Sequence, residues 1–428
     1  MAESGAAPLM ESEARKDEGS HSAAALVVML VAMTAFSQFF RTAVGTIAPE
    51  LRADIALDAR MLGLANGGFF IAFLVLQLPL GLLFDRYGVR RTVVWLTGFA
   101  ALGSAAGALC AEPWSFVASR VLVGVGSAGY FMGSLVVAGA WFRDRRFVSV
   151  LSWVYALSNI GTLAATAPLS YVSGLVGWRA AFIGIAVLTA LLGVGLHLFV
   201  RDTPNARPPA AQTPEGFAAM FGGWREVWRT PGIVPILAMA AVAYASISTM
   251  LGTWAAPYVN DVFGVSPAER GGLLLIFAGA QVVGTLGWGQ LAAHRIGTTR
   301  VIDQCSIVGI ALLAALALWP HPSLWVAMTL FALFCLIASF GSLVMMEGRQ
   351  LFPEHIAGRG ITTVNLSQVA GSALLPIITG AIVGWAPASN GAGSELAYRI
   401  AFGVIALSLL GGLIAYRAGK SKAAASNS

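Results

Sequence analysis

A single arginine interrupts the apolar run from Ala32 to Leu51, which otherwise predicts a membrane-spanning helix. A charge near the middle of such a helix costs about 2.5 to 3.5 kcal/mol on insertion scales, so it normally faces water, a partner or a ligand. At helical spacing, Arg41 shares one face with Thr34, Gln38 and Gly45. This face predicts the lining of a polar cavity in which Arg41 binds the negative group of a solute.

The chemistry that an isolated guanidinium offers is recognition of an anion. It stays charged at any relevant pH and presents a planar fork of donors that suits a carboxylate or a phosphate. The candidate acidic partners stand at expected helix ends: Asp85, Asp144 and Glu347 on one side of the membrane and Glu50 on the other. We therefore expect Arg41 to have no resident counter-charge.

Other polar residues stand inside apolar runs, in stripes at helical spacing. Each could contact a solute, and each could equally form an interhelical hydrogen bond, worth about 0.6 kcal/mol. The role of Arg120 has two alternatives as well. It could bind a solute, or, because it lies within two turns of a helix end, its long side chain could reach the surface. The candidate binding residues are Arg41, Gln38, Arg120, Tyr130, Tyr155, Asn159, Ser248, Gln281, Asn365 and Gln368.

The elements that must position these residues are membrane spans. The 428-residue chain is 57% hydrophobic and only 11% charged, against about 25% charged in soluble domains. Twelve apolar runs are long enough to cross a bilayer core of about 30 Å. They are Ala24–Ala48, Met61–Leu83, Thr92–Ala111, Ser115–Gly139, Val150–Gly174, Arg179–Val200, Ile233–Pro257, Gly271–Ala293, Val301–Trp319, Ser323–Met346, Ile361–Trp385 and Ala397–Tyr416.

Positive charge is distributed unevenly over the loops between these runs. Most of the 26 Lys and Arg stand in the loops and tails of one side, which the positive-inside rule assigns to the cytoplasm together with both termini. We therefore expect a multi-pass protein of the inner (cytoplasmic) membrane. The basic residues anchor loop ends and form no continuous patch, which argues against nucleic-acid binding.

One loop carries a specific resemblance to a known family. The segment GLLFDRYGVRRT, from Gly81 to Thr92, resembles the signature between the second and third helices of the major facilitator superfamily. The segment that begins at Arg120, RVLVGVGSAGYFMG, resembles the arginine and glycine pattern of the family's fourth helix. The resemblance implies a cytoplasmic loop that latches two halves of the protein together. Its motif residues are Gly81, Asp85, Arg86, Gly88 and Arg91.

The motif pattern returns in the second half of the chain, where Gly297 is the counterpart of Gly88. Repeat and resemblance together predict an all-α polytopic membrane protein with twelve transmembrane helices in two pseudo-symmetric six-helix bundles and the solute site between them. The expected parts are a disordered cytoplasmic tail (1–22), an N-terminal bundle (23–200), a cytoplasmic linker (201–232), a C-terminal bundle (233–417) and a second disordered tail (418–428).

The segments Phe40–Thr42 and Ala48–Leu51 resemble the first helix of the anion:cation symporter and organophosphate antiporter branches, in which an arginine contacts the substrate's negative group. The resemblance implies a secondary transporter that takes up a small organic anion by alternating access. A carboxylate is favoured over a phosphate ester, because Ser248 replaces the second arginine of phosphate exchangers. Phe40 and Ser127 replace the carboxylates of proton-coupled relatives, so H⁺ or Na⁺ coupling, exchange and facilitated movement all stay open.

Other functional classes fit the sequence less well. An exporter of amphipathic compounds or drugs is the alternative, although the expected fifth helix lacks the Gly-Pro-x-x-Gly-Gly element of drug:proton antiporters. A receptor or scaffold that has lost transport is a third class. We expect no enzyme, metal or cofactor, because the sequence has no metal-spaced cluster and no nucleophile with a base. The expected protein is a monomer whose partners are the bilayer and an anionic solute.

Overall fold

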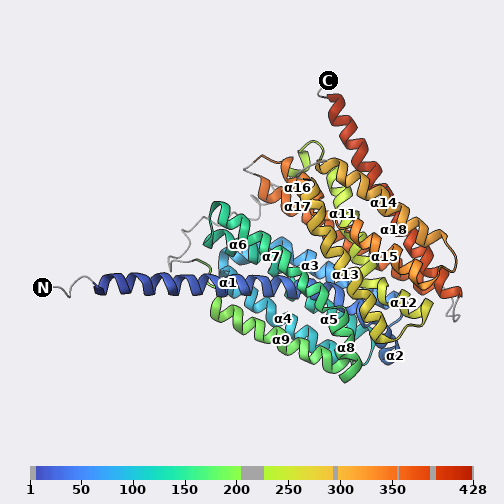
Figure 1. Cartoon of the computed structure of the whole chain (residues 1–428), viewed down its shortest axis with the longest axis horizontal. Coiled ribbons are helices and arrows are strands. Elements are labelled where there is room, and N and C mark those ends of the chain that lie inside the picture. Colours follow the sequence, from blue (N-terminus) through green and yellow to red (C-terminus); the bar gives the residue numbers. More distant parts are fainter. Residues whose placement is uncertain (1–5, 204–225, 293–296, 354–355, 386–391, 427–428) are drawn as a thin grey trace.

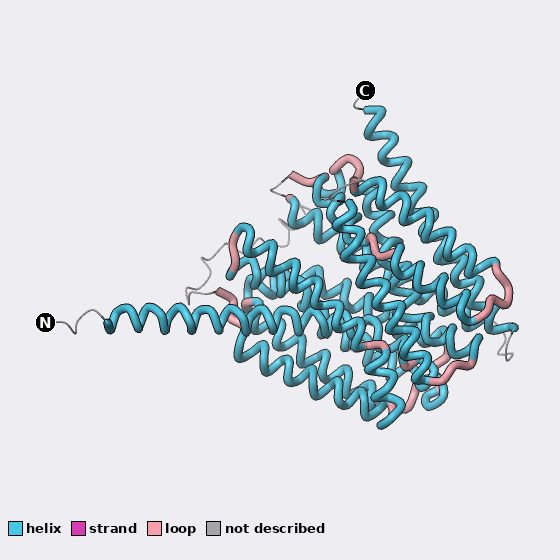
Figure 2. Tube along the Cα trace, viewed as in Figure 1, coloured by secondary structure: helices cyan, strands magenta, loops and turns pink. Residues whose placement is uncertain are grey.

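The computed structural model describes residues 6–203, 226–292, 297–353, 356–385 and 392–426. Within these ranges every regular element is a helix (Figure 2). Twelve stretches are long and apolar enough to cross a membrane, which confirms the predicted fold class and the number of spans. Most of the expected linker, residues 204–225, lies outside the described residues.

The first half of the chain forms one bundle, drawn from blue to green in Figure 1. Its helices are α1 (Ala6–Thr46), α2 (Ala48–Ile55), α3 (Ala59–Tyr87), α4 (Val89–Leu109), α5 (Pro113–Ser127), α6 (Gly129–Trp141), α7 (Asp144–Ala164), α8 (Ala167–Val176) and α9 (Trp178–Phe199).

The second half forms a second bundle, drawn from yellow to red in Figure 1. Its helices are α11 (Ile233–Thr249), the π-helix η1 (Met250–Trp254), α12 (Ala255–Phe263), α13 (Pro267–Leu291), α14 (Thr298–Leu318), α15 (Leu324–Ile337), α16 (Gly341–Gln350), α17 (Ala357–Trp385) and α18 (Ala392–Ser426).

Several spans consist of two helices joined by a break. One break separates α7 from α8 just before Pro168, whose ring cannot continue a helix without loss of a backbone hydrogen bond. The carbonyl of Ala165 at this break accepts a hydrogen bond from the Thr46 hydroxyl (2.6 Å). A different break lies in the seventh span, where η1 adds a π-turn between α11 and α12. Such turns locally change which side chains share a helix face.

The two bundles meet along three sets of helices: α3 packs on α17, α8 on α13, and α1 on η1 and α12. The contact of α1 with η1 requires two glycines. A Cβ atom built on Gly45 would lie 2.3 Å from the backbone oxygen of Gly252, and one on Gly252 would lie 2.8 Å from the backbone oxygen of Arg41. The backbones of the two halves therefore touch about one turn beyond Arg41.

Ion pairs between the bundles lie at the end of the molecule that carries α2 and α12, which we name the α2 face (Figure 1). Arg270 of α13 pairs with Glu50 of α2, and its side chain is only 2% exposed. Arg52 of α2 pairs with Asp261 of α12 at 2.6 Å. Both chain termini lie away from this face, at the opposite end of the bundles (Figure 1). The two halves are thus tied together at the α2 face.

The ends of the chain differ from the expectation of disordered tails. Helix α1 begins at Ala6 and α18 ends at Ser426, so both helices extend through most of the segments 1–22 and 418–428. The physical reason is composition: the first segment contains four Ala and four Glu and the second contains four Ala and two Lys, all good helix formers.

The contact of Gly45 with Gly252 can be tested by substitution. We expect Gly45→Ala to lower the unfolding free energy by about 1 to 3 kcal/mol, because the new methyl group overlaps backbone that cannot rotate away. The matched control is Gly81→Ala, where an added Cβ meets nothing within 4 Å. Thermal unfolding of the two purified variants measures the effect, and equal midpoints would contradict the described contact.

Candidate functional site

The guanidinium of Arg41 lies between the two bundles without an acidic partner. One of its nitrogens, Nη1, donates a hydrogen bond to the hydroxyl of Tyr244 on α11 (2.9 Å). Its central carbon lies over the rings of Phe73 (5.0 Å), Phe70 (5.8 Å) and Tyr244 (5.8 Å). Cation–π contacts of this kind hold the cation without neutralising its charge. Among the described residues, no carboxylate forms an ion pair with Arg41.

Two edges of the Arg41 guanidinium therefore differ. The Nη1 edge is occupied by Tyr244, whereas the Nε atom is buried and has no hydrogen-bond partner within the described chain. An arginine offers five N–H donors in one plane. A carboxylate could accept two of them side by side, from Nε and Nη2. The site thus has a charge and a donor pair that no other described residue uses.

A small cavity adjoins Arg41. Its volume is about 20 Å³, which is room for about one or two water molecules. Both bundles contribute to it, so it lies at their interface. Its lining residues are Gln38, Arg41, Thr42, Thr162, Tyr244, Ser248, Leu251, Gly252 and Gln281.

Four of the ten candidate residues come together at this cavity: Gln38, Arg41, Ser248 and Gln281. The sequence pattern did not single out Leu251 or Gly252. Both belong to η1, and a π-turn shifts the residues that follow it around the helix axis, so the spacing rule for an α-helix fails there. Phe70 and Phe73 were missed because two phenylalanines on an apolar helix look like ordinary core.

Three other candidates use their side-chain amides within the protein. Asn159 donates to the carbonyl of Tyr155 (3.1 Å) on its own helix. Gln368 donates to the carbonyl of Gly341 (3.2 Å) at the break between α15 and α16. Asn365 donates to Gln77 Oε1 (3.0 Å), which joins the two bundles through α3 and α17. Asn365 and Gln368 thus join different helices, as the packing alternative anticipated, whereas the Asn159 amide bonds within α7.

Arg120 and Tyr130 are buried away from the cavity. Tyr130 is 0% exposed and Arg120 is 2% exposed. An Arg120 nitrogen, Nη2, donates to the backbone oxygen of Phe40 (2.7 Å), and the guanidinium lies over the Phe69 ring at 4.8 Å. Arg120 thus ties α5 to α1 directly beside Arg41, and its contacts are those of a positioning residue. Tyr155 differs from both, because it is 43% exposed.

The motif loop between α3 and α4 is held within its own bundle. Gly88 adopts a φ of 81°, which favours glycine. The Asp202 carboxylate accepts a hydrogen bond from the Arg90 backbone N–H (2.7 Å) and so caps α4. Asp85 and Arg86 are exposed and form no hydrogen bond or ion pair with the second bundle in the described ranges. Their role as a latch stays a prediction.

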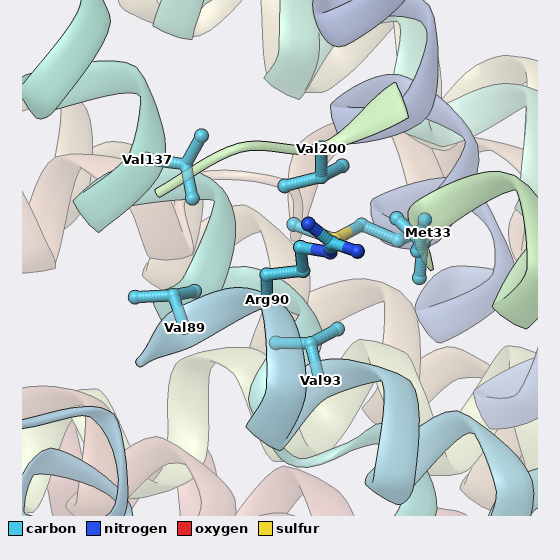
Figure 3. A pocket seen from close by; sticks show the side chains of 7 residues that line it. Met33, Val89, Arg90, Val93, Val137 and Val200 are labelled. Atoms are coloured by element: carbon cyan, nitrogen blue, oxygen red, sulfur yellow. The ribbon is translucent and has the colours of Figure 1, made fainter. Parts of the chain in front are cut away.

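A second cavity lies beneath this loop (Figure 3). Its volume is about 10 Å³, and Val89, Val93, Val137 and Val200 line it together with the Arg90 side chain. Such a volume is close to the lower limit for one water, and the lining is apolar except for Arg90, whose Nε is buried without a hydrogen-bond partner. We read this cavity as a packing gap. No cluster of His, Cys, Asp and Glu among the described residues could hold a metal ion.

Comparison with known proteins gives consistent matches. The family model of the Major Facilitator Superfamily matches residues 30–376. A protein of Agrobacterium vitis assigned as a tartrate transporter is 24% identical over 304 residues, 67% of each chain. A protein of Escherichia coli (strain K12) assigned as a galactarate/D-glucarate transporter is 22% identical over 402 residues, 86% of this chain and 88% of its own.

Two further similarities broaden this picture. A quinolone resistance transporter of Acinetobacter baumannii is 30% identical over 183 residues, 41% of this chain and 42% of its own. The crystal structure of a nucleoside transporter shares the fold with a TM-score of 0.72 at 14% identity, covering 92% of this chain and 98% of the other.

The hydrogen bond between Arg41 and Tyr244 predicts a stability difference. Tyr244→Phe removes the acceptor of a partly buried charged donor, so we expect the unfolding free energy to fall by about 0.5 to 1.5 kcal/mol. Tyr171→Phe is the matched control, because Tyr171 is 64% exposed. Thermal unfolding compares the two, and a Tyr244→Phe protein as stable as the control would show that the hydrogen bond contributes nothing.

Proposed function

The chain belongs to the major facilitator superfamily, and from this premise we propose that it is a secondary transporter that takes up a small organic anion, a carboxylate. The observation that carries the proposal is the Arg41 guanidinium, which lies at the interface of the two halves with its Nε edge unpaired. A charge that the protein leaves uncompensated in a low-dielectric site favours a solute that supplies the opposite charge.

The relatives support the same class of solute. Tartrate, galactarate and D-glucarate are named for two of them, and all three are carboxylates. The side chains beside Arg41 are neutral hydrogen-bonding groups, such as Gln38, Ser248 and Gln281. One fixed positive charge with neutral neighbours suits one carboxylate, and it leaves the rest of the solute to be recognised by other contacts.

The arrangement of contacts supports alternating access. In this conformation the α2 face is closed by Glu50 with Arg270 and by Arg52 with Asp261. For a solute to enter from that face, these pairs must separate and Gly45 must move away from Gly252. The positive-inside rule makes the α2 face the outer one in an inner membrane, with both termini in the cytoplasm. The proposal includes a monomer and leaves H⁺, Na⁺ or exchange as the driving process.

Export of amphipathic compounds is the second candidate, and the similarity to a quinolone resistance transporter favours it. The two functions differ in what they predict for cells. An exporter alters drug susceptibility when it is deleted or overproduced, whereas a carboxylate importer does not.

The role of Arg41 predicts two transport phenotypes. Arg41→Ala should reduce carboxylate uptake by at least about tenfold, because hydrogen bonds to a charged group contribute about 1.5 to 3 kcal/mol. Arg41→Lys should also be impaired, because lysine keeps the charge but lacks the planar fork. The measurement is uptake of a radiolabelled carboxylate into proteoliposomes, with the exposed Arg145→Ala as control. Near-normal uptake by Arg41→Ala would falsify the assigned role.

The ion pair between Glu50 and Arg270 allows a charge-reversal test. Glu50→Arg and Arg270→Glu should each reduce uptake, because each places two like charges together at the closing interface. The double variant restores opposite charges and should recover a substantial part of the lost rate. Proteoliposome uptake compares all three with the wild type. A double variant no better than either single one would mean that the pair has no role in closure.

A further inference from the structure

The part of the substrate that extends beyond its carboxylate can be inferred from the walls near Arg41, and this inference rests on the proposed function. The cavity beside the guanidinium has a volume of only about 20 Å³, so it can hold a carboxylate head and no more. The body of a bound acid must therefore extend along the interface between the bundles, toward side chains that are exposed there.

Tyr155 is the exposed side chain in that direction. It stands on the same face of α7 as Thr162, which lines the cavity, and lies two turns, about 10 Å, closer to the start of the helix. Its side chain is 43% exposed. Tyr155 does not line the cavity, and among the described residues no hydrogen bond joins it to Arg41. Helix spacing thus places an exposed aromatic ring about 10 Å along α7 from a residue that lines the cavity.

A second ring makes this position an aromatic wall. Phe131 of α6 packs edge-on against Tyr155, with ring centroids 4.9 Å apart and an angle of 66° between the planes. We define these two residues as the aromatic pair. An edge-to-face arrangement fixes the orientation of both rings. It leaves one face of the Tyr155 ring available for a third aromatic ring.

The neighbouring polar groups offer little to a polyhydroxylated body. The amide of Asn159, one turn from Tyr155, already donates to the carbonyls of Tyr155 and Ala156. Asn365 and Gln368 of the facing bundle are likewise occupied by Gln77 and Gly341. The amides of Gln38 and Gln281 remain, but both belong to the cavity that receives the head of the solute. The Gln77 Nε2 donor is also without a partner, but it is buried where α3 meets α17.

We propose that the substrate is an aromatic carboxylate, whose acid group binds Arg41 while its planar ring stacks on the aromatic pair Phe131 and Tyr155. The small cavity favours a carboxylate group, and the exposed Tyr155 ring favours a planar aromatic ring on the same molecule. Aliphatic hydroxy acids of the kind named for the relatives would satisfy the first requirement and fail the second.

The test measures equilibrium binding of three acids to the purified full-length protein in detergent. Benzoate is compared with cyclohexanecarboxylate, which has the same charge and nearly the same size but no π face, and with gluconate, which is polyhydroxylated. Benzoate should bind about 2- to 10-fold tighter than cyclohexanecarboxylate, the range expected for one stacking interaction between two aromatic rings. Gluconate should bind more weakly than both.

Two variants of Tyr155 distinguish a loss of ring stacking from a general loss of folded protein. Tyr155→Phe keeps the ring and should keep the preference for benzoate, whereas Tyr155→Leu should reduce the ratio of the two dissociation constants to about one. A ratio near one in the wild type, an unchanged ratio in Tyr155→Leu, or tighter binding of gluconate than benzoate would overturn the inference.

An Arg41→Gln variant distinguishes failure of this inference from failure of the proposed function. If cyclohexanecarboxylate or gluconate binds as well as benzoate and Arg41→Gln abolishes binding, only the aromatic preference is wrong. If Arg41→Gln binds benzoate as tightly as the wild type, or if none of the three acids binds, the proposed function fails together with the inference.

Discussion

An unpaired guanidinium in a low-dielectric interface is the constraint around which this molecule is arranged. Placing Arg41 within a membrane span costs free energy that only hydration, a partner or a ligand can offset. The protein supplies aromatic faces and one phenol hydroxyl, which support the cation without neutralising it. Within the described residues its Nε atom has no hydrogen-bond acceptor. Under the proposed function, the solute supplies the opposite charge.

The surrounding structure keeps that guanidinium in place and joins the two halves on one side of it. Arg120 donates to the carbonyl of Phe40 and so fixes the backbone next to Arg41. Close approach of Gly45 to Gly252 closes the interface on one side of the site. Beyond it, two inter-bundle ion pairs stabilise the closed α2 face. These contacts join different helices of the two halves, so a rocking motion that separates the halves would break them together. This coupling is what alternating access around a fixed site requires.

Much of the fold followed from the sequence because the membrane imposes a strong pattern. Apolar length alone predicted twelve spans, and the loop from Gly81 to Thr92 identified the family. Arg41 and Gln38 could be assigned to the cavity because their segment of α1 is a regular helix, in which spacing determines the face. The prediction did not extend to Leu251 and Gly252, since the π-turn of η1 breaks the spacing rule. Nor could the sequence show that Asn159, Asn365 and Gln368 use their amides internally, which depends on crossing geometry between distant helices.

The central claim is that Arg41 binds the carboxylate of the solute. A structure of the transporter with a bound carboxylate tests this claim most directly. An electron cryomicroscopy map in the presence of saturating benzoate should show the acid group within about 3.2 Å of Arg41 Nε and Nη2, the hydrogen-bond range for such a pair. A map in which Arg41 pairs with a carboxylate of the protein itself, or in which the acid binds elsewhere, would contradict the account.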